Sequence, residues 1–265
     1  VFDAPNVDEI EDNANELKIA ENNFKTQTGV TTIAKHKSAP DFERLVQLLP
    51  KECFQMETVS TDNCNLFFVD NCLVFPPNVI EIKERACQLL QSDVYHVFGS
   101  QVTKVGDLAF CSYYHLRTAF FPSLVSLGAQ CFALCGQLNS FIAPMCSQID
   151  RLAFYMCKNL EHFVAQPKIL AKNVFHGSKL KFLSLPSVEK VESEAFVGSL
   201  VQGVMLANCQ EFDEDAMKNS LALGNVVRTG CKDPRVQLHQ LKQIAELVKS
   251  NTEKKLKMKL KFDYQ

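Results

Sequence analysis

Cysteine and histidine are the residue types through which this sequence could do chemistry. It holds eleven cysteines and six histidines. No two cysteines form a C-x-x-C pair, and no two histidines stand at the i, i+4 spacing that places two metal ligands on one helix face. We therefore expect no metal site and no cofactor.

The cysteines could also act as nucleophiles. A nucleophilic cysteine needs a lowered thiol pKa and access to solvent. Most cysteines here stand beside phenylalanine, leucine or alanine, where a free thiol packs as a small apolar core residue. Eleven is an odd number, so at least one thiol stays unpaired. We predict buried, reduced thiols in a cytoplasmic protein, with Cys231 as the best candidate for an exposed thiol.

Other signatures of enzymes are missing from the sequence. A G-x-S-x-G nucleophile elbow, a phosphate-binding P-loop and a dinucleotide G-x-G-x-x-G do not occur among the ten glycines. The protein is therefore predicted not to be an enzyme.

Composition and charge describe a folded chain without a strong electrostatic field. Of 265 residues, 46% are hydrophobic and 22% are charged, which excludes wholesale disorder. The net charge of −2 attracts neither nucleic acid nor an anionic membrane. No apolar stretch approaches the ~18 residues of a membrane span. We expect no nucleic-acid partner and no membrane span.

An internal repeat predicts the elements that position these residues. An aliphatic residue is followed five positions later by a larger apolar one, and a degenerate L-x-x-L-x-L phrase comes after the pair. The pair recurs every 21 to 23 residues, as Ile82/Cys87, Val105/Phe110, Leu127/Phe132, Ile149/Phe154, Leu170/Phe175, Val191/Phe196 and Phe212/Met217.

A period of this length with an L-x-x-L-x-L phrase is typical of leucine-rich repeats, in which each unit gives one short strand and a return path. The return path carries A-F and often a cysteine three residues later, as at Cys135 and Cys157. This combination resembles the BspA-like class of leucine-rich repeat over about residues 79–217. The resemblance implies an α/β leucine-rich-repeat solenoid of stacked parallel strands, with short irregular or helical return segments and a helical C-terminal cap.

Stacked repeats bury their apolar residues as one column. We therefore expect an internal ladder of phenylalanine rings, made by Phe110, Phe132, Phe154, Phe175 and Phe196.

The chain is predicted to have three parts. Residues 1–75 form an acidic N-terminal cap with degenerate repeats and a helix over residues 41–49. Residues 76–228 form the leucine-rich repeats. Residues 229–265 form a cap helix, which begins at Asp233 and Pro234, and a strand in which lysines alternate with apolar residues. The basic strand is expected to cover a sheet edge, with binding of nucleic acid or anionic lipid as the alternative.

Partner binding is predicted on the concave face of the strands. The residue between the last two apolar positions of each L-x-x-L-x-L phrase points outward, and five of the six such residues are apolar. An exposed apolar stripe rimmed by polar groups is typical of a contact surface. The alternative is that these side chains only support one another across neighbouring strands. The candidate partner-binding residues are Tyr95, Phe98, Arg117, Phe120, Ile142, His162, Val164, Phe182 and Met205.

These features together predict a non-catalytic scaffold for protein–protein interaction, whose partner is another protein. The cytoplasm is the expected location. The alternative is a cell-surface or secreted adhesin of the same fold, for which several disulfides are expected.

Overall fold

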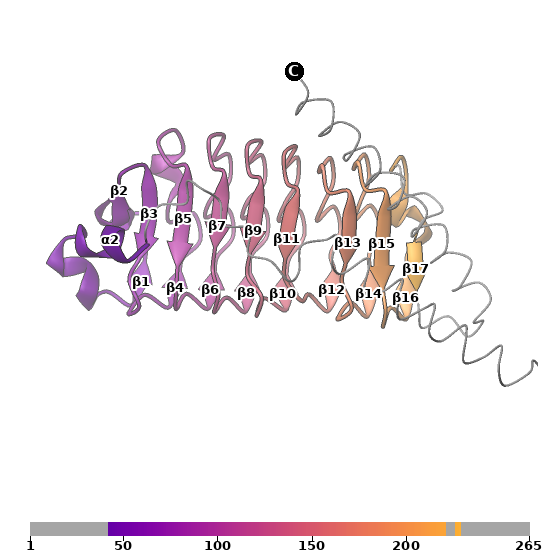
Figure 1. The fold of residues 1–265 in the computed structure, drawn as a ribbon, viewed down its shortest axis with the longest axis horizontal. Coiled ribbons are helices and arrows are strands. Elements are labelled where there is room, and N and C mark those ends of the chain that lie inside the picture. Colours follow the sequence, from indigo (N-terminus) through magenta and orange to yellow (C-terminus); the bar gives the residue numbers. More distant parts are fainter. Residues whose placement is uncertain (1–41, 221–225, 229–265) are drawn as a thin grey trace, which may run out of the picture.

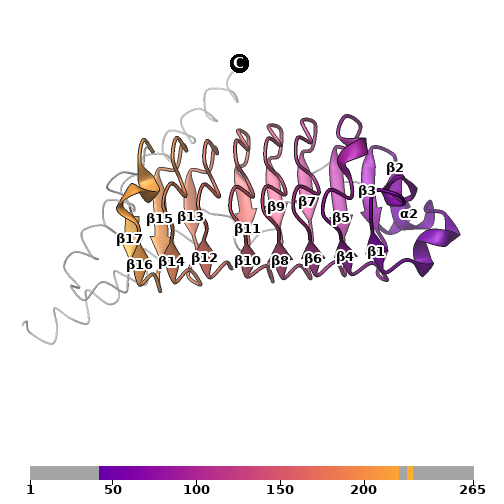
Figure 2. The same cartoon turned by 180° about the vertical axis from the view of Figure 1, so that it is seen from behind.

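Parallel strands stacked turn upon turn form the molecule. The computed structural model describes residues 42–220 and 226–228, and Figures 1 and 2 show the stack from its two sides. Each turn contributes one longer strand and one strand of two residues, and each kind of strand forms its own column. The expected solenoid of parallel strands is therefore confirmed.

The longer strands carry the L-x-x-L-x-L phrases. They are β3 (Cys72–Phe75), β5 (His96–Gly99), β7 (Thr118–Phe120), β9 (Ser140–Ile142), β11 (His162–Val164), β13 (Phe182–Ser184), β15 (Gly203–Leu206) and β17 (Val226–Arg228). At the N-terminal end, β2 (Phe68–Val69) pairs with β3 in the antiparallel sense.

The two-residue strands were not expected from the sequence. They are β1 (Thr58–Val59), β4 (Glu81–Ile82), β6 (Lys104–Val105), β8 (Ser126–Leu127), β10 (Gln148–Ile149), β12 (Ile169–Leu170), β14 (Lys190–Val191) and β16 (Glu211–Phe212). In the turns from β4 onward, the second residue of each is the first member of the repeating pair, so the repeat unit has two strands and not one.

Helical structure is short. The segment expected to be helical over residues 41–49 contains α2 (Phe42–Gln47), which confirms that prediction. The other helices of the described residues are 3-10 turns: η1 (Lys51–Gln55), η2 (Cys64–Phe67), η3 (Gln88–Leu90) and η4 (Glu214–Met217). The expected acidic segment up to residue 41, the cap helix, the basic strand and Cys231 lie outside the described residues.

Both strand columns are interrupted at the same level. Within the described strands, one sheet runs from β1 to β10 and another from β12 to β16, while the longer strands divide between β11 and β13. The break follows Val164 and comes where the spacing of the repeating pairs shortens from 22 to 21 residues. Pro167 lies in the connecting segment and has no N–H to donate.

The core is the predicted ladder of phenylalanine rings. All five phenylalanines are fully buried. Successive ring centroids, from Phe110 to Phe196, are 5.2, 5.8, 5.7 and 5.6 Å apart, and the ring planes are inclined by 15°, 2°, 17° and 23°. Aromatic pairs at such separations add to the stability that their burial provides. The turn-to-turn register that the sequence predicts is therefore confirmed.

The return segments within residues 58–220 are of the two expected kinds. Most are irregular, and η2, η3 and η4 are short 3-10 helices; none contains an α-helix. In the five turns of the phenylalanine ladder, a pair of left-handed residues prevents a helix, two positions before and two after the phenylalanine. Around Phe154 these are Leu152 (φ 60°) and Met156 (φ 58°). Left-handed residues cannot continue a right-handed helix.

Backbone hydrogen bonds still join successive return segments. The amide of Phe110 donates to the carbonyl of Cys131 (3.0 Å), and the amide of Phe132 donates to the carbonyl of Ala153 (2.9 Å). Each turn is thus bonded to the next along a third column, which satisfies buried backbone groups without a helix.

The position three residues after each phenylalanine forms a further column. The Cys135 thiol donates to the carbonyl of Phe110 and the Cys157 thiol to the carbonyl of Phe132, both at 3.1 Å. Serine replaces cysteine at this position in the later turns. Because its C–O bond is shorter than a C–S bond, its hydroxyl does not reach the carbonyl of the preceding turn. Four buried hydroxyls have no hydrogen-bond partner within the described part of the chain. Three of them, those of Ser178, Ser199 and Ser220, belong to this column, and the fourth is that of Ser100.

We expect Ser199→Cys to stabilise the protein by about 1–2 kcal/mol, because it replaces an unsatisfied buried hydroxyl with a thiol that reaches the preceding turn. The measurement is the free energy of unfolding in urea. Ser199→Ala is the matched control, since it removes the hydroxyl without adding a donor. Its free energy of unfolding should lie between that of the original chain and that of Ser199→Cys. A cysteine variant less stable than the original chain would contradict this explanation of the column.

Candidate protein-interaction face

The outward side of four neighbouring strands, β5, β7, β9 and β11, carries two aligned rows of side chains. Alternation along each strand turns Val97, Ala119 and Phe141 into the core, where all three are buried. Their neighbours therefore point outward, and the pairing register aligns them from strand to strand. We call these rows the strand face: a polar row of His96, Thr118, Ser140 and His162, and an apolar row of Phe98, Phe120, Ile142 and Val164.

Exposure along the apolar row is uneven. Phe120, Ile142 and Val164 are half-buried, but Phe98 is only 8% exposed. The sequence-based expectation that Phe98 is exposed is therefore wrong. Phe98 pairs with Val74 on one side and with Phe120 on the other, and its ring stacks on His96 with centroids 6.3 Å apart.

Two predicted partner-binding residues stand apart from the strand face. Phe182 lies in β13 and Met205 in β15, which belong to the separate sheet beyond the break. Met205 is only 2% exposed, so its expected exposure is also wrong. It pairs with Ser184 on one side and Val227 on the other, so neighbouring strands flank it. The structure therefore brings together seven of the nine predicted residues and leaves out these two.

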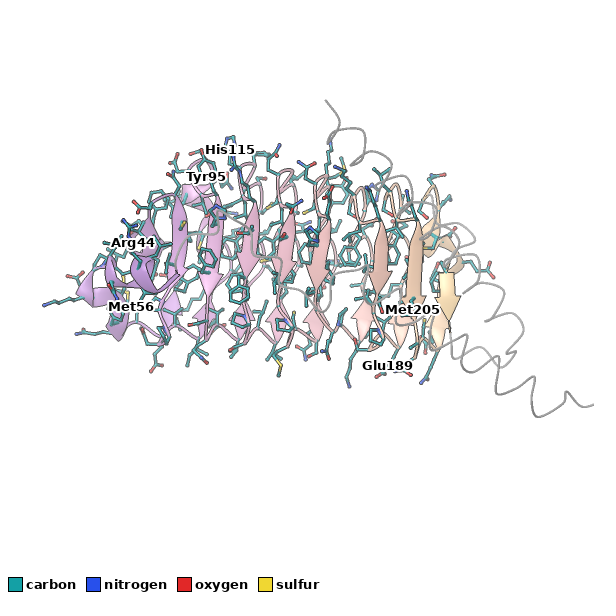
Figure 3. All side chains as sticks on the ribbon, in the orientation of Figure 1. Arg44, Met56, Tyr95, His115, Glu189 and Met205 are labelled. Carbon is teal, nitrogen blue, oxygen red and sulfur yellow. The ribbon has the colours of Figure 1, made fainter. Side chains whose placement is uncertain are left out.

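An aromatic and cationic cluster lies at the edge of the strand face, just before β5 and β7. The guanidinium carbon of Arg117 lies 5.0 Å from the ring centroid of Tyr95. His115 meets the same ring edge-on at 6.1 Å. Figure 3 shows Tyr95 and His115 together where the loops lead into the long strands. Arg117 and His115 are exposed, and His115 was not among the residues predicted from the sequence. We call these three residues the edge cluster.

The repeat geometry agrees with a match to a known family. The family model described as a BspA type leucine rich repeat region matches in six copies, over residues 62–171 and 168–229. The chain belongs to this family. No curated protein matches the sequence significantly.

Two solved structures are similar to this BspA-type chain to different degrees. One is described as a leucine rich cell surface protein from Faecalibacterium prausnitzii A2-165, with 24% identity and a TM-score of 0.52. The likeness covers 57% of this chain and 43% of that protein, so the chain matches less than half of its relative's length. A leucine-rich repeat protein from Bacteroides ovatus ATCC 8483 has 15% identity over 57% and 55% of the two chains. Its TM-score of 0.31 is too low to support a structural argument.

Hydrogen bonds hold three side chains in the polar row of this BspA-type solenoid. The Nδ1 atom of His96 lies 2.7 Å from the hydroxyl of Thr118. Burial, together with the positive charge of Arg117, lowers the pKa of His96 and favours its neutral form. Ser140 donates to the side-chain oxygen of Asn139 at 3.1 Å. Neighbouring side chains therefore engage His96, Thr118 and Ser140 in hydrogen bonds.

The cysteines of the BspA-type repeats lie in the core, as predicted. Nine of the ten described cysteines are buried and Cys111 is partly buried. Burial raises the thiol pKa of Cys72 to about 11 and of Cys146 to about 12, and raises those of Cys131, Cys135 and Cys157. A thiol with a raised pKa is a poor nucleophile at neutral pH.

Among residues 42–220 and 226–228, no three potential ligands of the types His, Cys, Asp or Glu gather at a site that could hold a metal ion. The same stretches contain no helix with the length and apolar character needed to cross a bilayer.

Proposed function

We propose that the chain is a non-catalytic protein-interaction module whose binding surface is the strand face together with the edge cluster. The observation that carries this proposal is the alignment of Phe120, Ile142 and Val164 on adjacent strands beside an exposed Arg117. The complementary partner is a protein that offers an apolar ridge to this row and an acidic group to Arg117.

Rigidity supports this proposal. Each strand of the face is held by both neighbours, except at the break, so little conformational entropy is lost when a partner binds. Tyrosine and arginine are also the residue types that contribute most to protein interfaces. In the edge cluster the ring of Tyr95 lies against Arg117, which fixes the orientation of the guanidinium group.

The competing explanation is that the apolar row only supports neighbouring strands. Cross-strand pairs of β-branched and aromatic residues stabilise a sheet without any ligand. This explanation accounts for Phe98, which is buried. It does not account for the exposed Arg117 at the edge of the strand face.

A capture experiment separates the two explanations. We expect the variant Arg117→Glu/Phe120→Ser to retain at least about tenfold less of its partner from native lysate than the intact chain, as is typical when interface anchors are lost. Quantitative mass spectrometry of the retained proteins is the measurement.

The matched control is Arg151→Glu/Leu134→Ser, which makes the same kind of changes at exposed residues of the return segments. It should retain the partner as the intact chain does. Equal retention by both double variants, with matching circular dichroism spectra, would leave the strand face with a structural role only.

The location is a separate question. The comparisons give no support to the cytoplasmic location expected from the sequence. The description of the Faecalibacterium relative favours the cell surface as a second candidate, at 24% identity. Labelling of intact cells with a membrane-impermeant amine reagent tests this, since a surface protein is modified and an internal one is protected.

A further inference from the structure

Two cysteines lie against each other near the N-terminal end of the stack. The sulfur atoms of Cys64 and Cys87 are 2.7 Å apart. Both residues are almost fully buried, at 3% and 1% exposure. They are 23 residues apart and so occupy the same position in consecutive turns.

Their position in the repeat explains the contact. Cys87 is the residue that corresponds to the phenylalanines of the ladder, and Cys64 stands one turn earlier. The turns are adjacent, because β1 pairs with β4 through Val59 and Ile82. Adjacent parallel strands are about 4.8 Å apart, and a disulfide joins Cα atoms about 4.4–6.8 Å apart. The spacing of the turns therefore suits a disulfide at this level of the core.

A small cavity borders this pair. It has a volume of about 150 Å³, and both cysteines line it. Thr61, Asp62 and Leu89 also line it and are exposed, so the cavity reaches the surface. Thiol–disulfide exchange requires such access to the sulfur atom.

Other cysteines of the chain are differently placed. Six of them donate their S–H groups to backbone carbonyls: Cys53, Cys72, Cys135, Cys146, Cys157 and Cys209. The bond from Cys64 goes instead to the sulfur of Cys87. This arrangement leaves the two sulfur atoms aimed at each other.

We propose that Cys64 and Cys87 are a site of oxidative modification, which forms a disulfide by exchange with a low-molecular-weight disulfide such as oxidised glutathione. In the first step one thiolate attacks the glutathione disulfide, which forms a mixed disulfide and releases one glutathione. In the second step the other cysteine displaces the second glutathione and forms the Cys64–Cys87 bond. The protein loses two electrons and two protons, and one glutathione disulfide becomes two thiols.

The consequence is a covalent link between the first two turns of the solenoid. It constrains the unfolded chain between residues 64 and 87 and so stabilises this end of the stack. Burial raises the pKa of Cys87, which stays protonated at neutral pH, so the exchange is expected to take hours. The inference is independent of the proposed interaction face.

The test uses the whole chain incubated with oxidised glutathione under native conditions. Remaining thiols are alkylated in denaturant, and the chain is digested without reduction for mass spectrometry. We expect a linked peptide pair containing Cys64 and Cys87, with a mass lower by two hydrogen atoms. Cys135 and Cys157 are the internal control, because they are also buried on consecutive turns but donate to carbonyls. Both should be recovered as alkylated, unlinked cysteines.

Alkylation of both Cys64 and Cys87 after this incubation would overturn the proposal, and so would links that join either one to a different cysteine. A thermal melt gives a second readout. The oxidised chain should melt about 5 °C higher than the chain kept in dithiothreitol. The Cys64→Ser variant should show no such difference between the two conditions, and an equal difference in this variant would also overturn the proposal.

Discussion

Replacing Phe154 with alanine is expected to destabilise the fold by about 3–5 kcal/mol. Phe154 is fully buried at the centre of the ladder. Its ring stacks between Phe132 at 5.8 Å and Phe175 at 5.7 Å, and it meets Phe141 and Phe163 edge-on at 4.8 and 5.4 Å. Alanine would leave a cavity between rigid turns that cannot close around it.

Chemical denaturation followed by circular dichroism measures this effect. Met145→Ala is the control, because Met145 is 64% exposed in the turn that follows β9. Its free energy of unfolding should change by less than about 0.5 kcal/mol. A loss of similarly small size for Phe154→Ala would mean that the rings do not share one continuous core.

Replacing Gly99 with leucine is expected to destabilise the protein by about 3 kcal/mol, although leucine is the usual residue at the last position of the L-x-x-L-x-L phrase. A Cβ atom on Gly99 would lie 2.7 Å from a methyl group of Val102 and 2.8 Å from the ring of Phe121. Phe121 holds the same position in the next turn and is fully buried. The ring of one turn thus fills the space that the preceding turn leaves empty.

A double-mutant cycle tests this exchange of volume between turns. Gly99→Leu/Phe121→Ala should be more stable than the sum of the two single changes predicts, by at least about 1 kcal/mol, because leucine can enter the space that the ring vacates. Urea unfolding of all four proteins is the measurement. Strict additivity would show that the two positions do not share one space.

Much of this fold could be predicted from the sequence because a solenoid converts sequence spacing directly into spatial stacking. The pairs such as Ile149/Phe154 recur at nearly constant intervals, and the rings do lie one above another. The longer strands follow from the apolar phrases for the same reason. Gly99 departs from the leucine pattern, and only the structure shows that Phe121 occupies the space beside it.

Other features left no readable signal. A strand of two residues is too short to show alternation, so the β4–β16 column was missed. Left-handed positions are easiest to find when glycine occupies them. Here Gly177 (φ 68°) and Gly198 (φ 64°) do so, but Leu134 (φ 63°) and Met156 (φ 58°) hold the same position in earlier turns. Left-handed backbone is unfavourable for leucine and methionine, and the hydrogen bonds between return segments offset this cost. Composition does not reveal those hydrogen bonds.

The candidate site was predicted in part. Alternation placed Phe120, Ile142 and Val164 correctly on the outward side of adjacent strands. The burial of Phe98 depends on its neighbours in β3 and β7, and the separation of Met205 depends on the break in the sheets. Both come from contacts between turns rather than from the pattern within one turn.

Nuclear Overhauser effects between phenylalanine rings test the stacked register most directly. In a sample with ¹³C-labelled phenylalanine rings, Phe154 should show ring-to-ring cross-peaks to Phe132, 22 residues earlier, and to Phe175, 21 residues later, because the centroids are 5.8 and 5.7 Å apart. The same pattern should continue from Phe110 to Phe196. Two results would contradict the stack and the strand face built upon it. One is a set of cross-peaks that joins Phe154 to rings outside its own and the two adjacent turns, and the other is the absence of cross-peaks to both ladder neighbours.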